Sequence, residues 1–186
     1  MNDYPRVLET PDPTLYLQRP RVLSSLLLHD HITEPANNAH LRQTEPWAED
    51  YTWGDAYGDT VNVCRSMKTG GDMMQYWLMG ADRQDASFHL AGRVTLYEHK
   101  GTEAYIGYHV GVTDCRRGFA TTASQRIVEH ARGMWGINTV LLAIAEGNVA
   151  SQGVARKLGA LPTECFKNSA SRGQVYTRRV WRWELD

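Results

Sequence analysis

The feature that most constrains the fold is a strand, helix and strand pattern in the middle of the chain. Residues 105–112 are β-branched and aromatic, which is typical of a strand. Apolar residues then recur every four positions from Phe119 to Trp135, which indicates one face of an amphipathic helix. Residues 140–145 form a short continuous apolar run, as in a strand buried on both faces. This order predicts a right-handed βαβ crossover in a mixed α/β layer.

The turn between the first strand and the helix has features of an anion site. It comprises residues 115–121, Cys-Arg-Arg-Gly-Phe-Ala-Thr. The first backbone N–H groups of a helix have no partner within the helix and lie at its positive end. Gly118 lets a ligand approach the backbone closely, and Arg116 and Arg117 add formal charge. We therefore predict an anion site built first from main-chain N–H groups; an ordinary helix start is the alternative.

A second motif follows the next strand and carries a resemblance to a known family. Asn148 and Ser151 form an Asn-x-x-Ser pattern, which leads into a short helix ending in Arg-Lys-Leu-Gly at 156–159. Together with Arg-Gly-Phe-Ala-Thr at 117–121, this order resembles the two acetyl-CoA motifs of the GNAT acetyltransferases. The stretch 38–47, with Asn-Ala-His-Leu-Arg and a later Pro-Trp, is similar to the RimJ/RimL-type ribosomal-protein branch. The resemblance runs from about residue 15 to the end.

The resemblance implies a GNAT fold, which is a mixed and mostly antiparallel central sheet with helices on both faces and a splayed parallel strand pair. We expect residues 1–186 to form a single acyl-CoA N-acyltransferase domain. Gly92 predicts a bulge or kink in its strand, and we expect residues 1–14 to be irregular. The remaining elements expected from the pattern are strands at 15–19, 73–79, 87–99, 161–167 and 175–183, a loop at 168–173, and helices at 22–31 and 60–68.

The resemblance also implies which residues hold the cofactor. In this family the first strand pairs with the pantetheine arm of acetyl-CoA, the turn holds the pyrophosphate, and coenzyme A is the product. Asn148 is implied to bond the pantetheine and Ser151 to protonate the departing sulfur, although Ser151 could instead be a helix cap. The implied cofactor-binding residues are Val110, Gly111, Val112, Arg116, Arg117, Gly118, Phe119, Ala120, Thr121, Asn148, Ser151 and Lys157.

Two positions depart from the family pattern. The family usually has Arg or Gln where this chain has Cys115. A cysteine near a helix start can have a depressed pKa and be reactive, and the alternative is a passive thiol. RimL-type enzymes carry a Glu that acts as general base, and the matching position here is Ala170. Another group must then accept the proton of the amine, or none does. The candidates are His109, which we place in the catalytic set with Asn148 and Ser151, and the carboxylates Glu103 and Glu146.

Residues 45–59 alternate acidic and aromatic side chains and contain no Lys or Arg. One interpretation is a solvated loop with aromatic residues tucked into the core. The other is the wall of a site for a cationic amine, because carboxylates attract a cation and aromatic faces bind it. The family's substrate groove involves the equivalent segment. The predicted substrate-binding residues are Glu45, Trp47, Asp50 and Trp53.

Titration chemistry favours an α-amine as the acceptor. About a tenth of an α-amino group of pKa near 7.8 is neutral at pH 7, against roughly one part in 2,500 for lysine. An enzyme without a strong base therefore loses less on a protein N-terminus or an aminoacyl-type small molecule. A polyamine or antibiotic acetyltransferase and a non-catalytic acyl-CoA sensor are the alternatives; transfer to aminoacyl-tRNA is a weaker one.

Charge and composition limit the other partners. The net charge of −1 argues against a nucleic-acid binder, and no apolar run is long enough to span a membrane. Three widely separated cysteines indicate reduced thiols in a cytoplasm. The cluster His29-Asp30-His31 has no third ligand signalled nearby, so we expect no metal. We expect a monomer or a homodimer.

Overall fold

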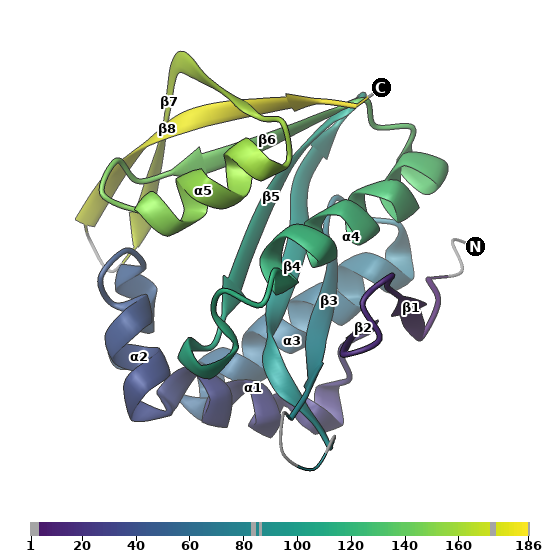
Figure 1. Cartoon of the computed structure of the whole chain (residues 1–186), viewed down its shortest axis with the longest axis vertical. Helices are drawn as coiled ribbons and strands as arrows, with labels where there is room; N and C mark the ends of the chain where they lie inside the picture. Colours follow the sequence, from purple (N-terminus) through teal and green to yellow (C-terminus); the bar gives the residue numbers. More distant parts are fainter. Residues whose placement is uncertain (1–3, 83–84, 86, 172–173, 186) are drawn as a thin grey trace.

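A computed structural model describes residues 4–82, 85, 87–171 and 174–185. Within them a sheet runs in the order β1-β2-β3-β4-β5-β6-β8-β7 (Figure 1). Only the β5–β6 pair among these strands is parallel. The strands are β1 (Val7–Glu9), β2 (Leu15–Gln18), β3 (Met74–Ala81), β4 (Phe88–Lys100), β5 (Glu103–Val110), β6 (Thr139–Ile144), β7 (Leu161–Ser171) and β8 (Gln174–Glu184).

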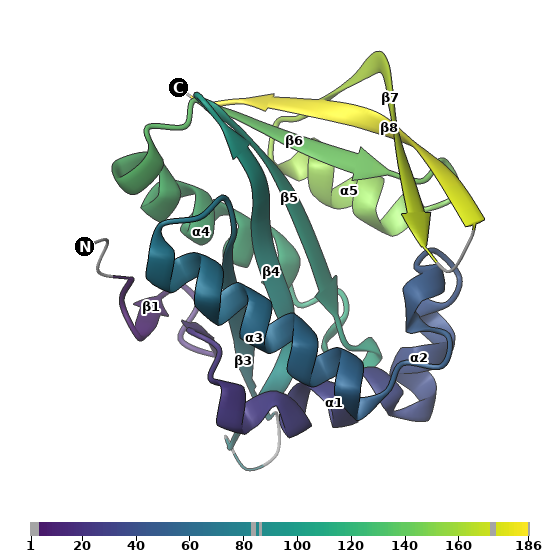
Figure 2. The same cartoon turned by 180° about the vertical axis from the view of Figure 1, so that it is seen from behind.

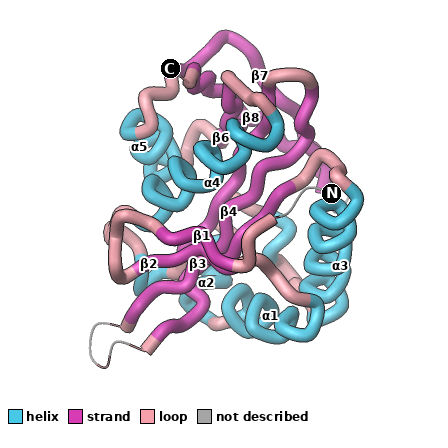
Figure 3. Tube along the Cα trace, turned by 90° about the vertical axis from the view of Figure 1, so that its right-hand side faces the viewer, coloured by secondary structure: helices cyan, strands magenta, loops and turns pink. Residues whose placement is uncertain are grey.

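Helices cover both faces of the sheet (Figure 3). Helices α4 and α5 lie on one face and α1, α2 and α3 on the other, as Figures 1 and 2 show from opposite sides. The apolar stripe predicted for α4 is buried, from Phe119 to Ala131. No helix in the described part of the chain is long and apolar enough to cross a membrane. The helices are α1 (Ser25–Thr33), α2 (Pro35–Leu41), α3 (Trp53–Thr69), α4 (Phe119–Trp135) and α5 (Val149–Lys157), with short 3₁₀ turns η1 (Val22–Ser24), η2 (Pro46–Ala48) and η3 (Val112–Asp114).

Strands β5 and β6 form the splayed parallel pair that the resemblance implied, which confirms the predicted fold class. Their register starts at Glu103 opposite Thr139 and ends at Tyr105 opposite Leu141, although β5 continues to Val110. Beyond this point the two strands diverge (Figure 2). An opening in the sheet therefore lies beside the second half of β5.

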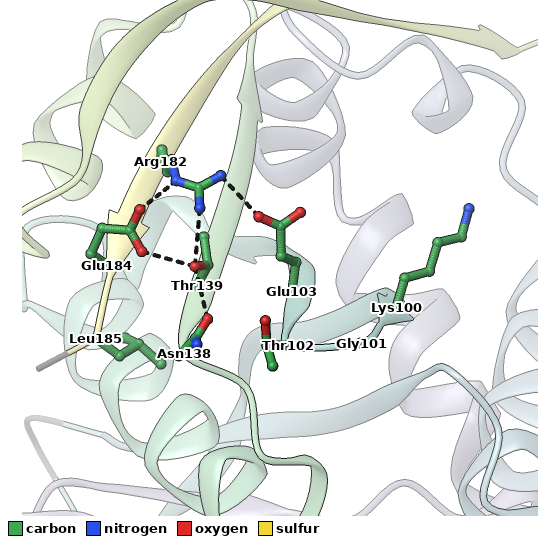
Figure 4. Close-up of a pocket in the computed structure, with 9 residues that line it drawn as sticks. All are labelled: Lys100, Gly101, Thr102, Glu103, Asn138, Thr139, Arg182, Glu184 and Leu185. Carbon is green, nitrogen blue, oxygen red and sulfur yellow. Dashed lines mark hydrogen bonds and ion pairs between the residues drawn. The ribbon is translucent and has the colours of Figure 1, made fainter.

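The closed end of this pair is held by a polar cluster that spans three strands (Figure 4). Arg182 on β8 donates to Glu103 on β5 at 2.9 Å and to the hydroxyl of Thr139 on β6 at 3.3 Å. Glu184 accepts from Thr139 at 2.8 Å and also pairs with Arg182. Exposed ion pairs stabilise a fold only modestly, so hydrogen bonding along the strands does most of the holding. The cluster therefore adds a small stabilisation at the end where β5 and β6 are paired.

Gly92 produces the predicted irregularity in β4. Leu78 of β3 pairs with Gly92, but the next residue, Met79, pairs with Leu90. Ala91 is therefore an extra residue on β4, and the register between the two strands shifts there. A side chain at Gly92 would collide with β5, since an ideal Cβ there lies 2.1 Å from the carbonyl oxygen of His109. The absence of a side chain lets the two strands approach closely at the position that carries His109.

The structure differs from the sequence expectations in four places. Helix α3 begins at Trp53 rather than at residue 60, because Thr52 and Asp55 form a capping box. Residues 35–41 form helix α2, which we did not predict, and residues 7–9 form β1 within the supposedly irregular start. Strand β7 continues to Ser171, so Ala170 is paired with Val175 in a hairpin instead of lying in a loop.

Candidate active site

The opening presents backbone groups of alternate β5 residues. The carbonyl of Thr102 accepts from Asn138 on the β6 side, whereas the N–H of Gly111 donates to Ala91 on β4. Because backbone groups alternate sides along a strand, even-numbered residues face β6. Past Tyr105 they have no β6 partner, so Tyr108 and Val110 turn their N–H and C=O groups to the opening. These groups can pair with an extended pantetheine-like chain.

Gly111 and Val112 are used differently from what the resemblance implied. The Val112 N–H donates to the side-chain oxygen of Asn37 at 2.7 Å, and the Gly111 N–H is taken by Ala91. An ideal Cβ at Gly111 would lie 2.8 Å from a ring carbon of His31. These two residues therefore anchor the turn to helices α1 and α2, and Val110 is the member of the predicted trio that faces the opening.

The turn itself has the geometry of an anion cradle. Arg116 and Gly118 both have left-handed backbone conformations, with φ of 63° and 85°. No side chain caps the start of α4, in contrast to α3 with its capping box. The first N–H groups of α4, from Phe119 to Thr121, consequently have no capping side chain among the described residues, and an anion would satisfy them.

The two arginines of the turn have different environments. Arg117 is nearly buried, donates to Asp114 at 2.6 Å and to the carbonyl of Ala81 at 2.9 Å, and lies over the ring of Phe119. Asp114 is only 2% exposed and also contacts the imidazole of His89 at 2.8 Å. Arg117 therefore shapes the turn with its charge compensated internally. Arg116 is exposed and adds positive charge to the cradle.

Cys115 is a passive thiol in this environment. Burial is the main cause that raises the pKa of its thiol above the ordinary value, and the nearby Asp114 carboxylate adds to the effect. The Sγ atom lies 3.9 Å from the carbonyl oxygen of Val110. A raised pKa favours the passive thiol over one activated by the helix end, because a reactive cysteine needs a depressed pKa.

Asn148 and Ser151 lie at the start of α5 with separate tasks. The side chain of Asn148 accepts from the N–H of Ser151 at 3.0 Å, so Asn148 is the cap and the capping alternative for Ser151 is ruled out. Burial raises the pKa of the Tyr108 phenol to about 12, and a hydrogen bond with the Ser151 side chain lowers it in part. The phenol of Tyr108 reaches across the opening to the backbone carbonyl of Ser151 at 3.3 Å. Lys157 lies exposed at the far end of α5.

A cavity of about 450 Å³ lies on the other side of the sheet, between α3, strands β3 to β5 and the β7–β8 hairpin. Tyr108 and His109 of β5 and Ala143 of β6 contribute to its wall, which brings it to the edge of the opening. The cavity therefore lies next to the part of β5 whose backbone groups have no partner on β6. Its other lining residues are Glu45, Trp47, Asp59, Asn62, Val63, Met73, Gln75, Arg93, Thr95, Tyr97, Glu98, Ile106, Gly107, Lys167 and Arg178.

His109 is the neutral polar group at this junction. Its ring stacks on His31 at 5.3 Å between centroids, and its Nε2 is buried with no hydrogen-bond partner among the described residues. Burial, with help from the charges of Arg93 and His31, holds the pKa of His109 well below 6.5. Burial likewise lowers the pKa of His31 to about 4. Both imidazoles are therefore uncharged near pH 7.

The other two candidate bases are already engaged. Glu103 belongs to the cluster at the closed end of the strand pair, away from the cavity. Glu146 is largely exposed and pairs with Arg179 at 3.4 Å. Ala170, which replaces the family glutamate, is exposed in the β7–β8 hairpin.

The acidic segment contributes two of its four predicted substrate-binding residues to the cavity, Glu45 and Trp47. The Glu45 carboxylate accepts from the indole of Trp47 at 2.8 Å and pairs with Arg178 at 3.2 Å. Trp53 stands exposed at the start of α3 and stacks on Tyr57, and Asp50 is also exposed; neither lines the cavity.

The acids of the cavity are balanced by cations from distant strands. Asp59 pairs with Arg93 at 3.3 Å, and Glu98 with Lys167 at 2.7 Å, beside the Glu45 pair described above. A polycation would therefore meet compensated carboxylates rather than a negative wall. The sequence pattern concealed this because the partners come from β4, β7 and β8.

Three residues of the site were missed by sequence reasoning. Tyr108 looked like one more aromatic residue of a strand, Asn37 lay in an unassigned stretch, and Gln75 was an isolated polar residue in an apolar strand. Of these, Gln75 carried a usable signal, because a polar residue inside a strand that is otherwise apolar needs a partner or a ligand.

The comparisons agree with this geometry. The acetyltransferase (GNAT) domain family matches residues 15–161. The structure of RimL, the ribosomal L7/L12 alpha-N-protein acetyltransferase in complex with coenzyme A, is similar with a TM-score of 0.81 and 18% identity over 97% of this chain and 98% of that one. The structure of the microcin C7 self-immunity acetyltransferase MccE, in complex with acetyl-CoA and AMP, is similar with a TM-score of 0.77 and 16% identity over 94% of each chain. The structure of RimJ from Mycobacterium smegmatis, in complex with a CoA-disulfide, is similar with a TM-score of 0.74 and 18% identity over 95% of this chain and 84% of that one. The search of curated proteins finds no significant match.

The splayed parallel pair beside an uncapped helix start is the arrangement that the resemblance to acyl-CoA-dependent acyltransferases implied. The match over most of the chain makes the assignment definite: this protein belongs to the GNAT family of acetyltransferases.

Proposed function

We propose that this enzyme transfers an acetyl group from acetyl-CoA to an α-amine, by direct attack while both substrates are bound. One observation carries the proposal. The opening between β5 and β6 has the uncapped turn and Ser151 on one side, and it meets the acceptor cavity on the other through Tyr108, His109 and Ala143. A thioester held in the opening would lie between a proton donor and the incoming amine.

The roles of the residues follow from their positions. Acetyl-CoA supplies the acetyl group as a thioester. The N–H groups at the start of α4 and the Arg116 side chain hold its pyrophosphate, and the backbones of Tyr108 and Val110 align its pantetheine arm. The oxygen of the Asn148 side chain serves as the cap, and among the described residues its NH₂ group has no acceptor, so it can donate to the pantetheine arm. The Ser151 hydroxyl donates a proton to the leaving sulfur, and Nε2 of His109 accepts the proton that the amine loses.

The character of His109 supports an α-amine rather than lysine. An imidazole whose pKa lies well below 6.5 is a weak base and cannot efficiently deprotonate an ammonium of pKa near 10.4. It suits an acceptor that is already partly neutral. The balanced charges of the cavity add a second argument, because they give a polyamine no uncompensated carboxylate.

The structural neighbours indicate what to test. RimL is described as an alpha-N-protein acetyltransferase, and MccE was captured with AMP. The RimL description supports a peptide N-terminus as the α-amine acceptor. The AMP beside acetyl-CoA in MccE makes aminoacyl nucleotides a second class of acceptor to test.

A panel of acceptors tests the proposal. Thiol release from acetyl-CoA should be at least about tenfold faster, in kcat/KM at pH 7, with N-terminal peptides or aminoacyl nucleotides than with N-blocked lysine peptides or spermidine, because the neutral fractions differ by roughly two orders of magnitude. Faster reaction of a lysine peptide or spermidine would contradict the α-amine assignment. Stabilisation by acetyl-CoA without thiol release from any amine would identify a non-catalytic sensor instead.

His109→Gln tests the proton acceptor. Glutamine keeps a polar side chain of similar size but cannot take a proton, so we expect kcat/KM to fall by about 10²-fold. His31→Gln is the matched control in the same stack and should have a much smaller effect. An unchanged rate in His109→Gln would make this histidine structural.

The pH profile gives an independent readout of the same assignment. Because the pKa of His109 lies well below 6.5, His109 is deprotonated throughout the range from pH 6.5 to 8.5. The rise of kcat/KM with pH should therefore follow the acceptor amine, near 7.8 for a peptide, and shift when a less basic amine is used. If kcat/KM instead rises with an apparent pKa near 6.5 that is the same for every acceptor, a histidine with an ordinary pKa controls the rate, which contradicts this assignment.

A further inference from the structure

Tyr108 carries the side chain that contacts the proposed proton donor across the opening. Its phenol donates to the backbone carbonyl of Ser151 at 3.3 Å, and it also shares a hydrogen bond with the Ser151 side chain. A phenol has a single proton, so while that proton goes to the carbonyl, the serine hydroxyl donates and the phenol oxygen accepts. Tyr108 therefore contacts both the backbone and the hydroxyl of Ser151 from the opposite wall of the opening.

The aromatic ring of Tyr108 is held in place by the hydrophobic core. It packs against the main cluster of buried apolar residues, to which α4 contributes Phe119 and α5 contributes Ala155. Side chains packed in this way occupy one rotamer, so the phenol oxygen has a fixed place beside Ser151. Burial also raises the pKa of the phenol to about 12, so Tyr108 keeps its proton and remains a hydrogen-bond donor near pH 7.

The chemistry of proton donation by a serine requires such a partner. A serine hydroxyl is a much weaker acid than a thiol, which titrates at a pKa of about 8.5. When Ser151 protonates the departing sulfur, an S–H bond forms, the serine O–H bond breaks, and negative charge develops on the serine oxygen. A hydrogen-bond donor that is already aimed at this oxygen stabilises the charge as it develops. The serine recovers its proton from water once coenzyme A leaves.

We propose that Tyr108 is a positioning residue for the proton donor: its phenol turns from the Ser151 carbonyl to the serine oxygen and donates to it while the sulfur takes the serine proton. The ring stays in place, and rotation of the two hydroxyl protons is the change required. This inference rests on the proposed function, because it requires Ser151 to protonate the leaving sulfur of acetyl-CoA.

Tyr108→Phe tests the positioning role. Phenylalanine keeps the ring in the core and removes only the hydroxyl, so kcat should fall by about 10–10²-fold, the effect of one hydrogen bond to a charged group. The KM for the peptide and the affinity for coenzyme A should change little, because the backbone of β5 is unaltered. Tyr105→Phe, on the same strand and outside the lining of the acceptor cavity, is the matched control and should keep the wild-type kcat.

A double-mutant cycle separates positioning from packing. If Tyr108 acts through Ser151, adding Tyr108→Phe to Ser151→Ala should leave kcat unchanged, with a ratio of about 1. In Ser151→Thr, which keeps a hydroxyl, the loss caused by Tyr108→Phe should return. A packing defect would instead reduce kcat by the same factor in every background. Tyr108→Met, which also lacks the hydroxyl, serves if the phenylalanine variant does not fold.

The outcomes separate this inference from the proposed function. No thiol release from any amine by the wild-type enzyme would overturn the proposed function itself. If the wild type is active and Tyr108→Phe has the same kcat, the positioning role alone is overturned. A loss of undiminished size in the Ser151→Ala background would overturn it as well, because the phenol would then act by packing or by donating directly to the sulfur.

Discussion

Ser151→Ala should slow acetyl transfer to the best α-amine acceptor by about 10²–10⁴-fold in kcat, the range typical for loss of a positioned proton donor. The substitution removes a hydroxyl whose partner is the Tyr108 phenol, whereas the cap of α5 comes from Asn148 and stays in place. We therefore expect the melting temperature and the affinity for coenzyme A to change little. Steady-state thiol release, together with thermal unfolding, checks both expectations.

Two variants make this result specific. Ser151→Thr keeps a hydroxyl on the same backbone position and should retain much more activity than alanine. Ser24→Ala, at the start of α1 where the side chain makes no capping bond, should leave the rate unchanged. If Ser151→Ala reacts as fast as the wild type, the leaving sulfur takes its proton from elsewhere, and Tyr108 becomes the candidate because its phenol lies nearest to Ser151 across the opening.

Gly92→Ala should lower the free energy of unfolding by at least about 3 kcal/mol, or prevent folding. A Cβ at this position would lie 2.1 Å from the carbonyl oxygen of His109 and 3.0 Å from the Cα of Val110. Both neighbours are backbone atoms of β5, so β4 and β5 would have to separate, and overpacking of this kind is strongly destabilising. Denaturant unfolding measures the loss.

The control for Gly92→Ala is the same substitution at Gly133. This glycine lies on the exposed face of α4, and an added Cβ would meet no atom within 4 Å. There alanine should stabilise by about 0.5–1 kcal/mol, because it favours helix. A loss below about 1 kcal/mol at Gly92 would show that the strands can separate easily. In any variant that folds, we also expect reduced activity, since His109 is carried on the displaced strand.

The backbone of the proposed cofactor side could be predicted in large part from the sequence. The turn and the Asn-x-x-Ser motif are local, because a strand, a tight turn and a helix start are specified by neighbouring residues. The roles of individual side chains were less predictable. Arg117 looked like a phosphate ligand, but it is held by Asp114 and Ala81, and the Ala81 contact spans 36 residues of chain.

The acceptor side depended on contacts between distant segments. The sequence of residues 45–59 predicts a negatively charged wall because it contains no Lys or Arg. In the structure, each carboxylate that lines the cavity pairs with a cation from β4, β7 or β8. The low pKa of His109 has the same origin. Its main cause is burial in a site where the ring stacks on His31 of α1, and the charge of Arg93 on β4 lowers the pKa further. No window of sequence contains that environment.

The sequence by itself determined the central strand, helix and strand order, the uncapped turn within it and the family, because backbone geometry and amphipathic period are encoded over short stretches. Only the tertiary structure decided where the strand pair opens, which charges face the acceptor, and which polar groups are left unpaired in the cavity. These properties follow from the register between strands and from burial, which depend on residues far apart in the chain and change strongly with displacements of a few ångströms.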